Sequence, residues 1–393
     1  MNPLKKLFKQ TAIYGLATVL PRVLSVVLVR LYTTVFEQAS GYGQYVTIYS
    51  WIAIFNVMLS YGMETAFFRF YNEKTEKSKV ISTSLISIAG TSLLFLFLSL
   101  LFRNQIAAIT NINIDFIKFV AFILVLDALV VIPFAMLRAY NKPKRYAVLK
   151  IVNVAINLGL NIFFLIALPK IAKEGQIWES IYKENFEISY IFISNLIASG
   201  CTLVFLLPAY LKTKYTFDLT LWKQMLRYAG PILIAGIAFT INEVLDKIFL
   251  AQMESEEVSG IYGACYKLAL FMTLFGTAFR MGVEPFFFSH SKSKNPQKTY
   301  AEITNYFVIL GSLILLVVIV FVDILAQLLL GNDTYFQALD IVPIVLLASF
   351  CLGIYHNLSV WYKITDNTKY GACLLYTSPS PRDQRGSRMP SSA

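Results

Sequence analysis

Apolar runs with little or no charge recur along the whole chain, and each is long enough for the roughly 20 residues that a membrane-spanning helix needs. Of all residues, 57% are hydrophobic and 15% are charged, whereas a soluble domain carries roughly 25% charged residues. Because lipid offers no partner to free backbone N–H and C=O groups, the spans must be helical. The pattern predicts an all-α, polytopic transmembrane helical bundle.

The apolar runs predict about ten spans. They cover residues 11–34, 44–68, 80–102, 116–137, 146–168, 187–208, 228–251, 261–288, 302–325 and 337–361. The first run follows a short basic segment, but it is too long for a cleaved signal peptide and no small-residue cleavage site closes it. We therefore expect the first helix to be retained.

Basic residues gather in every second loop, which indicates the orientation. Loops predicted to be cytoplasmic carry Lys5, Lys6, Lys9, Lys74, Lys77, Lys79, Lys142, Lys144, Arg145, Lys212, Lys214, Lys292 and Lys294. Loops predicted to lie outside carry only Arg103, Lys118, Lys170, Lys173 and Lys183. The positive-inside rule then places the N-terminus in the cytoplasm. Since the net charge of +11 comes from these loop clusters, it does not indicate nucleic-acid binding.

A short sequence motif occurs twice, and all matching positions are separated by the same number of residues. Tyr42-Gly43 recurs as Tyr262-Gly263, and the remaining matches are Gly62, Glu64, Phe67 and Phe68 with Gly282, Glu284, Phe287 and Phe288. Many transporters are built from repeated multi-helix halves, with the substrate path between them. Six spans precede the second copy, so both copies enter the membrane in the same orientation. This predicts two parallel-repeat lobes of six helices, over residues 1–212 and 213–372, with the second lobe incomplete.

The composition changes abruptly at Cys373. Residues 373–393 are rich in Ser, Pro and Arg and contain no long apolar run, as in a solvated, disordered tail. The stretch from Leu374 to Asp383 also looks like a translated sequencing adapter. We therefore interpret 373–393 as a non-native disordered tail and expect the native sequence of the second lobe to continue beyond Ala372.

Four phrases in the first lobe carry a family resemblance: Val29-Arg30-Leu-Tyr, Gly41-Tyr-Gly43-Gln-Tyr, Ser60-Tyr-Gly62-Met-Glu64 and Phe67-Phe68-Arg69-Phe-Tyr71. Together they resemble the N-terminal signature of Wzx-type polysaccharide transporters. These are oligosaccharide flippases of the multidrug/oligosaccharidyl-lipid/polysaccharide exporter (MOP) superfamily. The stretches 230–247 and 260–288 are similar to the second lobe of that family, and the resemblance covers residues 1–372.

The resemblance implies two lobes that face each other in a V and a multi-pass protein of the bacterial inner membrane. It implies the flipping of undecaprenyl-diphosphate-linked oligosaccharide for O-antigen, capsule or exopolysaccharide assembly. The expected partners are this lipid-linked oligosaccharide, membrane lipid, H⁺ or Na⁺, and polysaccharide-assembly proteins. Two alternatives stay open: a cation-coupled multidrug exporter of the same superfamily, and a membrane-embedded polysaccharide polymerase or glycosyltransferase.

Cationic residues inside the spans are candidates for binding the diphosphate, because an ionisable side chain there costs roughly 2.5–3.5 kcal/mol to insert. Arg22 follows Pro21 in the first span, and a guanidinium fork suits phosphate oxygens. Its structural alternative is an ion pair with an acid such as Asp127. Arg30 lies near the outer end, where it could simply extend to the interface. Lys267 in span 261–288 is a further candidate.

Glu243, Asp246 and Lys247 share one face of span 228–251. In the functional interpretation, Lys247 binds phosphate and one of the acids binds H⁺ or Na⁺. In the structural interpretation, a Glu243–Lys247 pair lowers the insertion cost. The sequence does not favour either interpretation over the other.

Three further acids inside the spans are Asp127, Glu64 and Glu284, which serve ion coupling or structure. For the two repeated glutamates, Glu64 and Glu284, we expect a contact between a helix end and a basic loop, and Glu284 is also placed to pair with Arg280. A stripe of asparagines, Asn153, Asn157 and Asn161, is explained by hydrogen bonds between helices.

No pattern for catalysis or metal binding stands out. The only histidines are His290 and His356, the four cysteines show no paired spacing, and no HExxH, CxxC or P-loop pattern occurs. We therefore predict no catalytic residues, no metal and no cofactor, and a protein that is not an enzyme.

Overall fold

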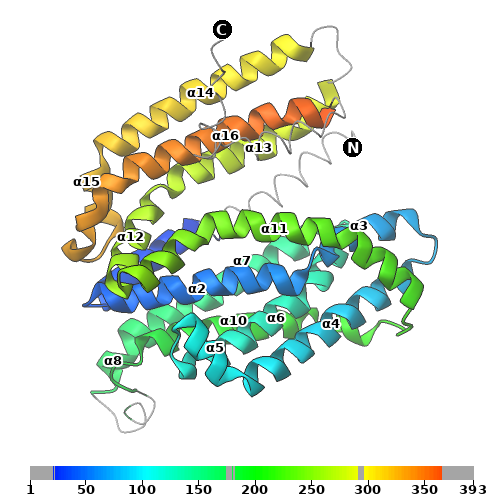
Figure 1. The fold of residues 1–393 in the computed structure, drawn as a ribbon, viewed down its shortest axis with the longest axis horizontal. Coiled ribbons are helices and arrows are strands. Elements are labelled where there is room, and N and C mark those ends of the chain that lie inside the picture. Colours follow the sequence, from blue (N-terminus) through cyan, green and yellow to red (C-terminus); the bar gives the residue numbers. More distant parts are fainter. Residues whose placement is uncertain (1–20, 22, 174–178, 180–181, 291–295, 365–393) are drawn as a thin grey trace, which may run out of the picture. The chain divides into compact units, whose positions relative to one another are not determined.

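A computed structural model describes residues 21, 23–173, 179, 182–290 and 296–364, and all of the secondary structure in these ranges is helical (Figure 1). The helices are α2 (Ala39–Ser60), α3 (Met63–Glu73), α4 (Lys77–Leu101), α5 (Arg103–Thr110), α6 (Ile114–Ala139), α7 (Pro143–Ile162), the π-helical turn η1 (Phe163–Ala167), α8 (Leu168–Ile171), α10 (Glu187–Leu211), α11 (Leu219–Met253), α12 (Glu256–Leu268), α13 (Leu270–His290), α14 (Pro296–Val320), α15 (Val322–Leu329), the 3₁₀ segment η2 (Asp333–Ile341) and α16 (Val342–Ile364).

Several of these helices can cross a membrane. In the described part of the chain, seven helical segments are long and apolar enough, or eight if the bent pair α12–α13 counts as one span. The predicted span 11–34 is represented by the shorter apolar helix Val23–Val35, and its beginning lies outside the described residues. Helix α11 covers the predicted span 228–251. The prediction of an all-α, multi-pass membrane protein is confirmed.

The chain divides into two compact units. The first contains residues 1–268 together with 323–341, and the second contains 269–322 and 342–393. In the first unit, α11 and α12 both pack on α2, so this unit extends past the predicted lobe boundary at 212. In the second unit, α13, α14 and α16 pack on one another, and Phe307 stacks between Phe275 and Phe350. The tail 373–393 lies outside the described residues.

The repeated glycine Gly62 separates α2 from α3. Tyr61 and Gly62 have φ angles of 31° and 69°, which is the left-handed region that glycine tolerates best. A Cβ added to Gly62 would also lie 2.9 Å from the carbonyl oxygen of Ala229 on α11. Glycine is therefore required here both by the turn and by the close approach of α11.

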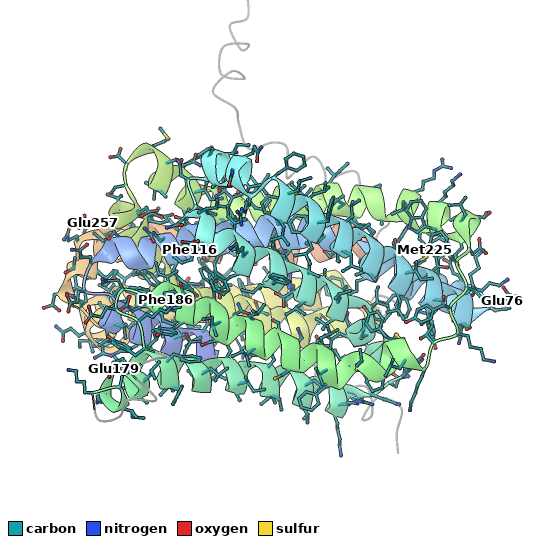
Figure 2. All side chains as sticks on the ribbon, turned by 90° about the horizontal axis from the view of Figure 1, so that it is seen from below. Glu76, Phe116, Glu179, Phe186, Met225 and Glu257 are labelled. Carbon is teal, nitrogen blue, oxygen red and sulfur yellow. The ribbon has the colours of Figure 1, made fainter. Side chains whose placement is uncertain are left out.

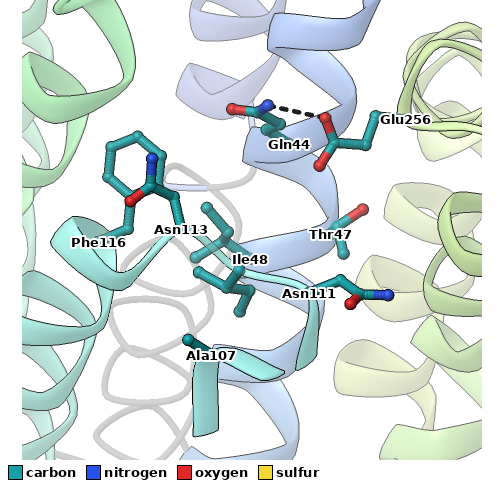
Figure 3. A pocket seen from close by; sticks show the side chains of 9 residues that line it. Gln44, Thr47, Ile48, Ala107, Asn111, Asn113, Phe116 and Glu256 are labelled. Carbon is teal, nitrogen blue, oxygen red and sulfur yellow. Dashed lines mark hydrogen bonds between the residues drawn. The ribbon is translucent and has the colours of Figure 1, made fainter. Parts of the chain in front are cut away.

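Helices α2 and α12, which carry the two Tyr-Gly copies, meet with almost no space between their backbones. A Cβ on Gly43 would fall 1.7 Å from the carbonyl oxygen of Glu256, and one on Gly260 would fall 2.1 Å from that of Ala39. Small residues of this kind let membrane helices approach closely. Beside the contact, Gln44 Nε2 donates a 2.7 Å hydrogen bond to Glu256 Oε2, in the wall of a cavity of about 350 Å³ (Figure 3).

The helix ends of the first unit fall into two groups. Glu76 and Met225 lie at one end of the unit, and Glu179, Phe186 and Glu257 lie toward the other (Figure 2). The first group neighbours loops predicted to be cytoplasmic, and the second belongs to loops predicted to lie outside. The arrangement follows the alternation that the basic loops predict.

Candidate functional site

Five helices of the first unit, α2, α3, α6, α7 and α10, enclose a polar cavity of about 450 Å³ that we call the Asp127 cavity. Its polar wall consists of Asn56, Glu64, Asp127, Arg138, Tyr146, Lys150, Asn153, Asn157, Asn195 and Ser199. Polar side chains inside membrane helices are expensive, and those facing a cavity often mark an ion or substrate path. The Asp127 cavity is therefore a candidate site.

Asp127 comes from the middle of α6 and is held from α10. Ser199 Oγ donates a 2.8 Å hydrogen bond to Asp127 Oδ1, and Asn195 Nδ2 on the same helix donates a 2.7 Å bond to Tyr49 Oη on α2. A hydroxyl donor leaves the charge of Asp127 uncompensated. Lys150 on α7 lines the same cavity.

Lys150 was not among the predicted site residues. Its ammonium nitrogen lies 4.5 Å from the centre of the Phe134 ring, and no ion pair between Lys150 and Asp127 forms among the described residues. A signal was present in the sequence, because Lys150 falls inside the predicted span 146–168 and three residues before Asn153. An acid and a base thus face one membrane cavity without touching.

Glu64, the repeated acid of the first copy, forms a close ion pair with Arg138 in the last turn of α6. The guanidinium carbon of Arg138 also lies 4.9 Å from the centre of the Phe68 ring. The expected partner was a basic loop, but Arg69 in that region pairs with Glu73 on its own helix, at 3.0 Å. Arg138, which the sequence analysis did not select, fixes α3 to α6 at one side of the cavity.

The asparagine stripe does bond between helices, as predicted. Asn153 Nδ2 donates a 2.9 Å bond to Thr202 Oγ1 on α10, and Tyr32 Oη donates a 3.1 Å bond to Asn161 Oδ1. Asn161 Nδ2 donates to Asn157 Oδ1 at 2.7 Å. Asn153 and Asn157 also line the Asp127 cavity, a position that their spacing in the sequence does not indicate. The π-helical turn η1 follows this stripe directly, a distortion that is frequent at functional sites.

A second candidate, the Lys247 site, lies where α11 meets α12 and consists of Glu243, Asp246, Lys247, Tyr262 and Tyr266. Lys247 is only 8% exposed, and its Nζ lies 2.9 and 3.0 Å from the two carboxylate oxygens of Asp246. The Nζ also lies 3.7 Å from the centre of the Tyr266 ring, and Tyr262 Oη donates a 2.7 Å bond to Asp246 Oδ2.

The predicted Glu243–Lys247 pair is not the one that forms. Lys247 Nζ donates to the backbone carbonyl of Glu243 at 3.0 Å, while its ion pair is with Asp246. Lys267 lies in the last turn of α12, the helix that also carries Tyr262 and Tyr266 of this site. Of the predicted cations, Lys247 is therefore buried at this site with one carboxylate in contact.

Arg30 makes a contact that the sequence pattern did not suggest. Its Nη1 lies 2.5, 3.0 and 2.7 Å from the carbonyl oxygens of Gln327, Leu328 and Leu330, at the C-terminal end of α15. A cation there satisfies unpaired carbonyls and the negative end of the helix dipole. Arg30 thus forms a helix cap, which is a structural role, and these contacts give no support to its predicted binding of substrate.

Two predicted residues cannot be placed. Arg22 lies outside the described residues, so its proposed contact with Asp127 does too. Glu284 lies in α13, in a stretch whose side chains are not described. Its predicted pairing with Arg280 therefore falls outside the described residues as well. Among the residues that the structure describes, no group of three or more His, Cys, Asp or Glu side chains could hold a metal ion.

A membrane bundle with charged groups facing an internal cavity is typical of a membrane transporter. Residues 7–284 match the family described as "Polysaccharide biosynthesis protein", and residues 231–378 match the MatE family. Because the first match covers more than half of the chain, this chain belongs to the polysaccharide biosynthesis protein family. It is a transporter or flippase of the MOP superfamily.

Solved structures agree in fold. The lipid II flippase MurJ, in an inward closed conformation, matches with a TM-score of 0.69 and 18% identity, over 91% of this chain and 77% of that one. An inward-facing MATE-family multidrug resistance transporter of the MOP superfamily matches with a TM-score of 0.63 and 11% identity, over 93% and 89%. The MATE transporter VcmN of Vibrio cholerae, in a mutant form, gives 0.58 and 16%, over 92% and 86%. No curated protein sequence matches the chain.

Proposed function

We propose that this chain flips undecaprenyl-diphosphate-linked oligosaccharide across the bacterial inner membrane, from the cytoplasmic to the outer leaflet, by alternating access. The observation that carries the proposal is the match of residues 7–284 to the polysaccharide biosynthesis family. The buried Lys247 of the Lys247 site supports it, because a diphosphate that leaves water must meet fixed positive charge. In this proposal the N-terminus is cytoplasmic and the chain has no catalytic role.

In the proposed mechanism, Lys247 and Lys267 hold the diphosphate. Without substrate, Asp246 compensates the buried charge of Lys247. A diphosphate brings more than one negative charge and can compensate both lysines together. Phosphate oxygens then replace the Asp246 carboxylate at Lys247. Arg22 is proposed to add a bidentate contact from the first helix.

The Asp127 cavity is proposed as the coupling site for H⁺ or Na⁺. Asp127 accepts a hydrogen bond from Ser199 and lacks an ion-pair partner among the described residues, so a proton or a sodium ion can compensate its charge. Ion binding at Asp127 would then bias one arrangement of α6, α7 and α10 over another.

A cation-coupled multidrug exporter is the second candidate, favoured by the MATE structures that share this fold. Such a protein would bind a cationic or apolar drug, for which a carboxylate and aromatic rings are the suitable partners. Lys247 and Lys267 are unsuited to a cationic drug, since like charges repel. Proteins that assemble surface polysaccharide are the partners expected under the first proposal and not under the second.

The two functions are separated by a transport assay with both substrates. The purified full-length protein is reconstituted into vesicles that contain fluorescent undecaprenyl-diphosphate-linked oligosaccharide, and the fraction accessible to a lectin outside is followed over time. The first proposal predicts protein-dependent flipping and no export of cationic dyes. Dye export driven by a proton or sodium gradient, without flipping, would support the exporter instead.

A further inference from the structure

A basic pocket lies at the end of the first unit where the cytoplasmic loops are predicted. It is a cavity of about 630 Å³ between the ends of α4, α6, α7 and α10. Five cations from three segments line it, and no carboxylate does: Lys77, Lys142, Arg145, Lys212 and Lys214. None of its lining residues belongs to the Asp127 cavity, so the two are separate sites.

The charge of the basic pocket is not compensated by nearby acids. Glu73 pairs with Arg69 at 3.0 Å and Glu76 pairs with Lys79 at 2.5 Å, so both acids of the neighbouring loop already have partners. In the described ranges, none of the ion pairs includes any of the five cations. Like charges held around one cavity repel, and a bound anion would lower that repulsion.

Some of the cations are oriented by other contacts. The Nζ of Lys77 lies 5.0 Å from the centre of the Tyr71 ring, and that of Lys142 lies 5.8 Å from the Tyr140 ring. Arg145 reaches only a long hydrogen bond, 3.5 Å, to the carbonyl of Phe205. Aromatic rings hold the lysines through their faces but leave the ammonium hydrogens available for an anion.

Apolar side chains also line the pocket, several of them from α10. Ile81, Met136, Leu137 and Leu206 line it together with Pro133 and Pro208. On the same helix, Val204, Phe205 and Leu211 are 65%, 50% and 74% exposed, as expected for side chains that face acyl chains. A ligand that fits both parts has an anionic head and apolar tails, which a soluble phosphate lacks.

We propose that the basic pocket binds the phosphate headgroup of an anionic phospholipid of the cytoplasmic leaflet, with its acyl chains along α10. Basic pockets between transmembrane helices on this side of a membrane suit anionic lipid heads. The five cations and the cavity volume favour a lipid that carries two phosphates, such as cardiolipin, over one that carries a single phosphate. This site is independent of the substrate proposed above.

The test uses the full-length protein purified in a neutral detergent and titrated with defined lipids. Cardiolipin should bind in native mass spectra and raise the unfolding temperature, phosphatidylglycerol should do so more weakly, and phosphatidylcholine should not. In Lys142→Ala/Arg145→Ala the apparent affinity for cardiolipin should fall about 30-fold, from roughly 1 kcal/mol for each basic residue near an anionic surface and tenfold per 1.4 kcal/mol.

The matched control is Lys223→Ala/Arg227→Ala, which removes two exposed cations from the start of α11, outside the pocket. It should bind cardiolipin as the wild type does. Equal affinity of the Lys142/Arg145 variant and the wild type would overturn the proposal, and so would binding of phosphatidylcholine as tight as that of cardiolipin. Binding of inorganic pyrophosphate as tight as that of cardiolipin would show a site for soluble anions instead. The unfolding temperature in phosphatidylcholine separates lost binding from lost folding.

Discussion

Lys247 forms its ion pair with Asp246, the residue directly before it on α11, at 2.9 Å. Neighbouring residues on a helix do not normally face each other, so the lysine side chain must fold back along its own helix. Its hydrogen bond to the carbonyl of Glu243, one turn earlier, holds this conformation. The pair therefore lies within α11, and a ligand can replace Asp246 at Lys247 without separating two helices.

The first prediction concerns the stability of this pair. Asp246→Ala leaves the buried ammonium of Lys247 without its carboxylate, which should cost about 3–5 kcal/mol of unfolding free energy. Asp246→Ala/Lys247→Met removes both charges and should restore most of the stability, although not transport. Thermal unfolding of the purified variants, followed by tryptophan fluorescence, measures the difference. If Asp246→Ala were as stable as Asp246→Ala/Lys247→Met, the ion pair would not contribute to the stability of the fold.

A second prediction tests Asp127 as the coupling acid. Asp127→Asn keeps an acceptor for the hydroxyl of Ser199 but removes the charge, so the fold should persist. Transport should lose its dependence on a proton or sodium gradient and fall at least about tenfold, since one tenfold step is only 1.4 kcal/mol in the barrier. Ser199→Ala is the control, because it removes the hydrogen bond and keeps the charge. Gradient-driven transport by Asp127→Asn at the wild-type rate would exclude this role.

The close contact of α2 and α12 gives a third prediction. Gly43→Ala places a methyl group against the backbone of Glu256 and should destabilise the protein by about 1–3 kcal/mol, as overpacking does. The control is Gly90→Ala on α4, where a Cβ meets nothing within 4 Å. The unfolding temperature should fall for the first variant and hold for the second. If the unfolding temperatures of Gly43→Ala and Gly90→Ala changed equally, α2 and α12 would not be in close backbone contact in the membrane.

Orientation is the fourth prediction, and it rests on the basic loops. Reporter fusions should show cytoplasm after Glu73, Asn141, Lys214 and Lys294, and the outside after Glu37, Gly175 and Glu256. The helix ends in the first unit separate in the same way, since Glu76 and Glu257 lie at opposite ends. If two or more of the seven fusions reported the opposite side of the membrane, the ten-span topology would be wrong.

Of the ten predicted spans, seven or eight correspond to helices that are long and apolar enough to cross a membrane in the described residues, because each apolar run is a local signal that depends only on its own residues. Pairing across helices is not local. Arg30 caps α15 from 297 positions away, and nothing near Arg30 in the sequence indicates that partner. Lys150 and Arg138 were not predicted as site residues, because they become part of a site only where helices from distant parts of the sequence enclose the Asp127 cavity. For Lys247, spacing favoured Glu243, yet the side-chain conformation selects Asp246.

The central claim, that cations of this chain hold the diphosphate of a lipid-linked oligosaccharide, is tested most directly by restoring surface glycan in a strain that lacks its flippase. The host expresses the full-length gene with Arg22→Ala, Lys247→Ala or both, and membrane abundance is measured in parallel. We expect each single variant to abolish surface glycan at normal abundance, because losing one buried charged contact costs about 2–5 kcal/mol. Arg22→Lys should restore little, since an ammonium lacks the bidentate fork. Wild-type levels of surface glycan in the double variant would contradict the account.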